Sequence, residues 1–545
     1  MHSSPTFLLE GARRLSRDDA DVRNEDGPGR LTVEGKAARS KTSTVSRDDG
    51  WTWPDPEKQQ ADGLKHGVRE ENAKEEEHGD ASLVGWDGDD DPENPQNMKQ
   101  WKKWMVTVSM ASMTLCITFA SSIFSTATSA TAEEFGVSTE VTTLATSLFV
   151  LGFAFGPLIF GPISELYGRT RPLFTGFAVF AVLNVPLAVA RNLETVLVCR
   201  FFGGVFSSAP LAVVGGALAD MWDPVNRGIA AAVFSGATFV GPVLGPILGG
   251  FVTDSPLGWR WTAWLIMIMA SMFGFLGFFT IPETYAPVLL QRRARKLRYQ
   301  TKNWALHAKS EEEPVDLKVI AEKYLLRPFK MIVMEPILIL VTIYMSVIYG
   351  IVYLLFEAYP IAFQEQRGWN EGVGALPFLA LIVGVVFGAF IIAYTCKTSF
   401  KRALEKEGRV IPEARLPPMM IGAFVFPAGM FWFAWTSGPN LPWVPQVVAG
   451  APIGMGVLLI FLQGMNYIID VYGVNTNSAL AANTFFRSVM GACFPMFAVK
   501  MFRNLGVRWA TNLLGFLTVA LIPVPLLFFQ YGAKIRKMSR YAPNA

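Results

Sequence analysis

The chain has 545 residues, of which 51% are hydrophobic and only 17% are charged, whereas soluble globular proteins carry roughly a quarter charged residues. Its formal net charge of +3 gives no reason to expect a nucleic-acid partner. The sequence contains neither an HExxH nor a GxxxxGK[ST] motif, which argues against a membrane metalloprotease and against a self-contained ATP-driven pump.

The first hundred residues differ sharply from the rest. They are polar and rich in charged residues, Gly and Ser, as in EENAKEEEHGD and DGDDDPENP. Such a segment cannot bury enough apolar surface to offset its chain entropy, so we predict a disordered N-terminal tail over residues 1–100. The apolar run in MHSSPTFLLEGARR is too short for a signal peptide.

The remainder reads as membrane-spanning helices, each of which needs roughly 20 apolar residues to cross a bilayer core. We find twelve such segments, at about 104–126, 141–161, 172–190, 195–219, 229–253, 261–281, 332–356, 371–394, 417–437, 444–469, 479–500 and 509–531. The sequence therefore predicts an all-α membrane protein with twelve transmembrane helices. Its parts are the tail, a six-helix half (101–281), a linker (282–331), a second six-helix half (332–533) and a C-terminal tail (534–545).

The basic residues predict the orientation. If the N-terminal tail is cytoplasmic, the loops, linker and tail on that side hold 24 Lys and Arg residues, against six on the other side. An excess of Lys and Arg marks the cytoplasmic face of membrane proteins. We therefore expect both termini and the linker in the cytoplasm.

The cysteines carry no sign of a metal or disulfide site. They lie far apart, in or at the ends of apolar segments, at positions Cys116, Cys199, Cys396 and Cys493. We interpret these cysteines as small, buried hydrophobic side chains. We expect no metal, no cofactor and no enzymatic activity.

The stretch GPISELYGRTRP, residues 161–172, places charges between two apolar segments. Gly161 and Gly168 allow close helix contact and a tight turn, and Arg169 and Arg171 suit an interfacial loop. Glu165 is a carboxylate at a membrane edge, where it can pair with an arginine or lie near a helix N-terminus. Two interpretations stay open at this point, a gate between moving helices and an ordinary basic loop.

The pattern G-P-x-S-E-x-x-G-R-x-x-P resembles the loop-two signature of the major facilitator superfamily, in the form found in its fungal twelve-span drug:proton antiporters. Other stretches resemble that group in order: DPENPQN, LVCRFFGGVFSSAPL, GATFVGPVLGPILGG, PETYAPVLLQRRARKLR, NYIIDVYG and AANTFFRSVMGACFP. The resemblance covers roughly residues 90–535. One departure is NMKQWKKW, where the group more often has a tryptophan directly after the asparagine.

This resemblance implies two six-helix halves that rock about a central cavity, with the substrate site near the midplane. It also implies an inner gate in which Glu165 and Arg169 form a charge network with Asp220. The resemblance further assigns an antiporter motif to the fifth span, which favours efflux. Its residues are Gly241, Pro242, Gly245 and Gly249, and a packing face between two helices is an equally good account of its glycines.

Charges within the spans are costly, on the order of +3 kcal/mol each on insertion scales. The sequence keeps Arg200, Glu357, Asp470 and Arg487 in such positions. We expect Glu357 to carry the proton, with Asp470 as the next candidate. Arg200 is expected to anchor substrate or to assist the proton, and a structural hydrogen-bonding role is its alternative. Asp470 and Arg487 have the second half's cytoplasmic gate as their alternative.

Aromatic residues such as Tyr353 fall on the spans expected to line the cavity, and they suit bulky, weakly polar molecules. The sequence thus predicts a monomeric, proton-driven exporter of drugs, toxins or secondary metabolites in a lipid bilayer. The plasma membrane is the expected location and the vacuolar membrane the alternative. Polyamine export and a transporter-like nutrient sensor stay open as other functions.

Overall fold

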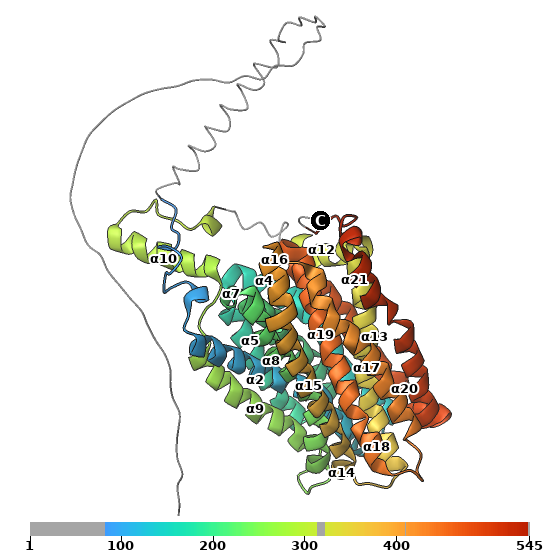
Figure 1. Ribbon diagram of the computed structural model, residues 1–545. Coiled ribbons are helices and arrows are strands. Elements are labelled where there is room, and N and C mark those ends of the chain that lie inside the picture. The colour runs from blue at the N-terminus through green and yellow to red at the C-terminus, as the bar shows by residue number, and fades with distance from the viewer. Residues whose placement is uncertain (1–81, 313–321, 409, 543–545) are drawn as a thin grey trace, which may run out of the picture. The chain divides into compact units, whose positions relative to one another are not determined.

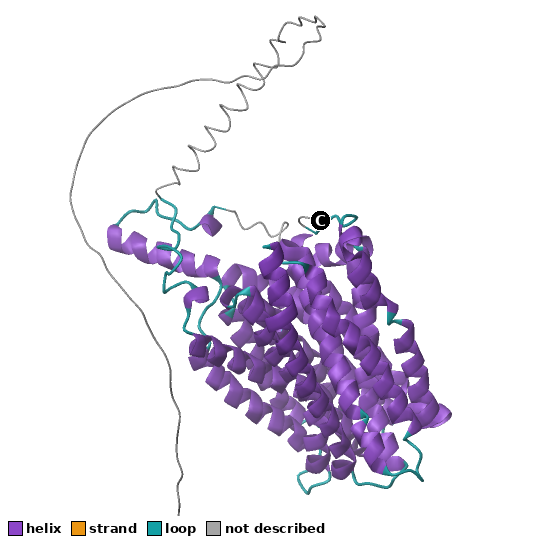
Figure 2. Cartoon of the chain, viewed as in Figure 1, coloured by secondary structure: helices purple, strands orange, loops and turns teal. Residues whose placement is uncertain are grey.

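The computed structural model describes residues 82–312, 322–408 and 410–542, so the predicted tail over residues 1–81 lies outside the described part. Within these ranges the chain is built from helices and contains no β-strand (Figure 2). The prediction of an all-α protein is therefore confirmed.

The first half contains six long helical stretches. Its elements are α2 (Gln100–Ile123), α3 (Thr128–Phe135), α4 (Thr139–Tyr167), α5 (Thr170–Ala188), α6 (Leu193–Ser207), α7 (Ala209–Met221), α8 (Pro224–Thr253) and α9 (Arg260–Thr280). Since α2 runs on into α3 and α6 into α7, these eight elements make six spans. They coincide with the six segments predicted from hydropathy.

Two linker helices lead into the second half, α10 (Ala286–Thr301) and α12 (Arg327–Met334). The second half consists of α13 (Pro336–Pro360), α14 (Glu371–Ala375), α15 (Leu379–Thr395), α16 (Lys401–Glu407), α17 (Leu416–Trp435), α18 (Trp443–Val448), α19 (Gly450–Tyr472), α20 (Thr476–Ala520) and α21 (Pro523–Arg536). In Figure 1, α10, α12 and α16 lie at one end of the bundle, which we call the linker end, and α14 and α18 lie at the far end.

Length and hydropathy identify eleven membrane-crossing stretches among the described residues, one fewer than the sequence predicts. The last stretch runs over Thr476–Arg536, which at 61 residues is far too long for a single span. It breaks at Gly506, whose φ of 72° and ψ of 154° are not helical. Two spans share this stretch, one on each side of Gly506, and the twelve predicted spans are accounted for.

Local sequence signals set several helix boundaries. The Asp223 side chain accepts a hydrogen bond from the backbone N–H of Asn226 at 3.1 Å, and Pro224 occupies the first position of α8. Both features are favoured at helix starts. Gly136 ends α3 in the left-handed conformation with a φ of 63°, which glycine adopts without steric cost.

Residues 82–99, which were predicted to belong to the disordered tail, contact the linker through their first part and α7 through Pro95–Asn97. Val84 packs in a small apolar cluster with residues of the linker, and Arg293 forms ion pairs with Asp87 and Asp91. Hydrogen bonds from the backbone N–H of Asp87 and from Arg293 lower the pKa of Asp91 to about 2. Composition indicated a disordered segment because it does not reveal that these carboxylates have a fixed cationic partner.

Helix α8 packs against α2 through the predicted antiporter motif. A Cβ built on Gly241 would lie 2.1 Å from Thr118 Oγ1, and one built on Gly245 would lie 2.1 Å from Ser122 Oγ. At Gly249 the nearest atom, in Thr126, would be 2.5 Å away. The glycines therefore form a contact face that brings the two helices close together.

We predict that Gly245→Ala destabilises the protein, because its Cβ would also come within 2.8 Å of the backbone nitrogen of Ile123. Overpacking of this kind typically costs about 1–3 kcal/mol. The matched control is Gly236→Ala on the same helix, where the nearest atom would be 4.0 Å away. Denaturant titration in detergent should show a loss for Gly245→Ala alone, and equal stabilities would contradict the close packing.

Candidate functional site

A charge network occupies the linker end of the first half. Arg169, at the start of α5, is buried and its Nε lies 3.0 Å from Asp220 Oδ2 at the end of α7. Its Nη1 donates to Ser164 Oγ at 3.1 Å, and its guanidinium carbon lies 4.6 Å from the centre of the Tyr285 ring. The pairing of Arg169 with Asp220 that the resemblance implied is therefore present.

Glu283 holds the turn that presents Arg169. Its carboxylate accepts the backbone N–H of Arg169 at 2.8 Å and that of Thr170 at 3.2 Å. Gly168 has a φ of 92°, and a Cβ there would lie 2.4 Å from Glu283 Oε2. Burial and then the Glu165 carboxylate raise the pKa of Tyr285, so its hydroxyl stays protonated. Glu283 was not predicted as a site residue from the sequence, although it lies in the PETYAPV stretch.

The second half repeats this arrangement and ties it to the first half. Arg415, which directly precedes α17, places Nε 2.9 Å from Asp470 Oδ2 near the end of α19. Arg227, near the start of α8, places Nη2 2.9 Å from Asp470 Oδ1. Asp470 is therefore held by two arginines, one from each half. Asp470 was a sequence-based candidate for proton coupling and for a gate, but neither arginine was predicted as its partner.

Glu165 contacts the second half. Asn477, at the start of α20, donates a hydrogen bond from Nδ2 to the Glu165 carboxylate. A cavity of about 370 Å³ lies beside this contact and is lined by both charge networks. Of the other predicted gate residues, Arg171 is exposed, and Gly161 lines a second cavity together with Ser164 and Asn477.

Glu357 lies toward the far end, in a cavity of about 130 Å³. Hydroxyl groups from the first half line the cavity, at Ser125, Thr126, Thr128, Ser129, Thr139 and Thr143. Glu365 shares it but is paired with Arg503 at 2.7 Å. Within the described part of the chain, Glu357 has no ion pair and no hydrogen bond to its carboxylate. Glu371 also lines this cavity and was not predicted as a site residue from the sequence.

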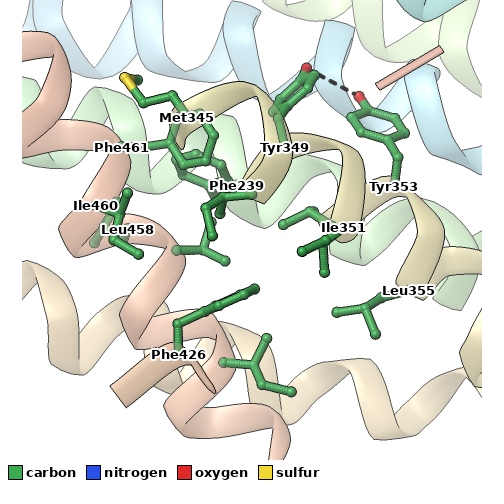
Figure 3. Close-up of a cluster of buried hydrophobic side chains, with 14 of the residues drawn as sticks. Phe239, Met345, Tyr349, Ile351, Tyr353, Leu355, Phe426, Leu458, Ile460 and Phe461 are labelled. Carbon is green, nitrogen blue, oxygen red and sulfur yellow. Dashed lines mark hydrogen bonds between the residues drawn. The ribbon is translucent and has the colours of Figure 1, made fainter. Parts of the chain in front are cut away.

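Figure 3 shows a buried cluster of aromatic and aliphatic side chains to which both halves contribute. The Tyr349 and Tyr353 hydroxyls lie 3.4 Å apart, and Tyr353 also reaches Ser121 Oγ of the first half at 2.9 Å. The rings of Phe239 and Phe461, one from each half, have centroids 5.1 Å apart. Tyr353 therefore links the two halves through its hydroxyl, and its place in a substrate cavity stays a prediction.

Arg200 has a hydrogen-bonded environment of its own. It is 1% exposed and donates to the backbone carbonyls of Ala120 at 2.8 Å, Ala145 at 3.2 Å and Ser121 at 3.3 Å. Its guanidinium also lies over the Phe149 ring at 4.3 Å. This geometry matches the structural alternative for Arg200 rather than direct contact with a substrate.

Comparisons with known proteins agree on one family. The Major Facilitator Superfamily model matches residues 110–495. The citrinin biosynthesis cluster MFS transporter of Monascus ruber is 54% identical over 481 residues, which cover 87% of this chain and 96% of that protein. The cercosporin MFS transporter of Cercospora nicotianae is 46% identical, with 87% and 92% covered.

Two solved structures share the fold. The proton:xylose symporter XylE has a TM-score of 0.56 at 15% identity, with 80% of this chain and 96% of that chain covered. The human organic anion transporter MFSD10 has a TM-score of 0.55, also at 15% identity, with 80% and 99% covered. At this identity the likeness concerns the fold alone.

We predict that Asp470→Asn destabilises the bundle by about 3 kcal/mol, because breaking a buried ion pair leaves uncompensated charge. The substitution weakens two ion pairs at once, and Arg415 is buried. The control is Glu405→Gln, which removes an exposed pair with Lys401 and should cost less than about 1 kcal/mol. Unfolding of the purified proteins in detergent by denaturant measures both, and equal losses would contradict the role of Asp470.

Proposed function

Because this chain belongs to the Major Facilitator Superfamily and is a membrane transporter rather than an enzyme, we propose that it exports small, largely hydrophobic organic molecules by proton antiport. The observation that carries this proposal is its similarity to transporters of fungal biosynthesis clusters. The citrinin cluster transporter is 54% identical and the ascochitine cluster transporter of Didymella fabae is 51% identical, both over most of their length. Secondary metabolites are therefore the proposed substrate class.

Alternating access requires contacts that join the halves at each end and break in turn. At the linker end, Asp470 pairs with Arg227 across the halves. At the far end, Lys500 of α20 lies 3.7 Å from Glu140 of α4, and both side chains are substantially exposed. The linker-end contact is more buried, so its opening is the more costly half of the cycle.

Glu357 is the proposed proton carrier. An antiporter needs a carboxylate that takes a proton from solution and releases it again, and a fixed cationic partner would hold such a group ionised. Glu357 lines a cavity toward the far end and has no such partner among the described residues. Glu365 in the same cavity is paired with Arg503 and is unsuited to this role.

The linker end is proposed to face the cytoplasm, because the loops, linker and tail expected there hold most of the Lys and Arg residues. We further propose that the protein is a monomer in the plasma membrane. A polyamine exporter would need carboxylates around its substrate, whereas the described central cluster holds a buried arginine, Arg487, among aromatic rings. Export of weakly polar molecules is the better match.

We predict that Glu357→Gln abolishes uphill, pH-driven export while leaving substrate binding nearly unchanged, because glutamine keeps the shape and hydrogen bonding but cannot titrate. Purified protein in sealed proteoliposomes with an imposed pH gradient would be assayed with citrinin. Glu365→Gln is the matched control in the same cavity and should retain uphill export.

The two parts of the proposal fail separately. If Glu357→Gln still exports uphill, another group carries the proton, and Glu371 in the same cavity is the next candidate. Absence of any flux in the wild-type protein, with citrinin and with a panel of aromatic fungal metabolites, would contradict export itself.

A further inference from the structure

Four arginines are buried in the described part of the chain, and three of them are compensated. Arg169 and Arg415 pair with aspartates, and Arg200 donates to three backbone carbonyls. Arg487 of α20 is 8% exposed and forms no ion pair with any described residue. Its Nε has no hydrogen-bond partner either.

Aromatic rings form the surroundings of Arg487. Its guanidinium carbon lies 4.9 Å from the centre of the Tyr349 ring and 5.6 Å from that of Phe461. One turn further along α20, Gly491 leaves room for the Tyr349 ring, because a Cβ there would lie 2.8 Å from it. Cation–π contacts stabilise the charge, but they give the buried Nε–H of Arg487 no acceptor, and it has none among the described residues.

A buried cation without an acceptor is costly. In a transporter that cost is acceptable where a ligand supplies the missing charge. We propose that Arg487 binds an anionic group of the exported molecule, a carboxylate or an ionised acidic phenol, through its planar fork of N–H donors. This inference rests on the proposed export function and names the substrate class as aromatic or otherwise apolar organic acids.

The position of Arg487 fits such a site. Tyr349 and Phe461 lie near the midpoints of α13 and α19, and Phe239 from the first half packs on Phe461. Val150, also from the first half, approaches Gly491, since a Cβ there would lie 3.2 Å from it. A ligand held by Arg487 would therefore touch both halves, as alternating access requires.

The test compares two probes with one ring system, 1-pyrenebutyrate and its uncharged methyl ester. Binding to the purified protein in a neutral detergent is followed by pyrene fluorescence polarisation. The wild-type protein should bind the acid about tenfold or more tightly than the ester, as expected for a charge-assisted hydrogen bond. Arg487→Gln should remove this preference and leave ester binding unchanged, whereas Arg487→Lys should retain part of it.

The matched control is Arg503→Gln, which removes one positive charge from the same helix at an exposed ion pair. It should alter acid binding by less than about twofold, since charge outside the central cluster is screened. An equal loss in both variants means general electrostatic attraction and overturns the inference. So does a wild-type protein that fails to prefer the acid, including one that binds neither probe.

Transport distinguishes this inference from the export function. If wild-type protein and Arg487→Gln both concentrate citrinin equally well, export stands and the role of Arg487 is wrong. Loss of uphill citrinin export in Arg487→Gln, with normal folding by size-exclusion chromatography, supports the assignment. If the wild-type protein exports nothing, a preference for the acid that Arg487→Gln removes and Arg503→Gln keeps still identifies Arg487 as an anion site, and the export proposal alone fails.

Discussion

The need to compensate charge inside an apolar helix bundle governs this structure. Arg415 meets Asp470, Arg200 meets three carbonyls, and the buried Glu335 accepts hydrogen bonds from the backbone N–H groups of Arg540 and Tyr541. Each contact satisfies a charge where water cannot, and each also fixes one segment of chain against another. Structural charges are thus recognisable by their partners, and charges that lack partners become candidates for function.

The two halves use the same device at the linker end. In each half an arginine at the start of one span reaches an aspartate near the end of a neighbouring span, Arg169 to Asp220 and Arg415 to Asp470. The symmetry is broken by Arg227, which reaches across to Asp470. Because Asp470 pairs with an arginine of each half, separation of the halves at this end in the proposed transport cycle would break its pair with Arg227 and leave its pair with Arg415.

Hydropathy alone located the spans, because an apolar stretch of sufficient length has few alternatives to crossing a bilayer. It could not locate contacts between the halves, since Glu165 and Asn477 are separated by 312 positions in the chain. The pairing of Arg169 with Asp220 could be predicted only from the resemblance of the GPISELYGRTRP stretch to a known family signature. By contrast, Arg487 was expected either in the membrane interior or at the cytoplasmic gate, and only its packing against two aromatic rings distinguishes these.

The proposed proton and substrate sites share one helix. Tyr349, Tyr353 and Glu357 recur every four residues along α13 and so lie on one face. Tyr349 lies under Arg487 at one end of this row, and Glu357 faces its hydroxyl-lined cavity at the other. Tyr353 between them is hydrogen-bonded to Tyr349 and to the first half. Any tilt of α13 that repacks the aromatic rings around a ligand also moves the carboxylate within its cavity. Coupling between substrate binding and proton binding then follows from the rigidity of α13 alone and requires no pathway through other helices.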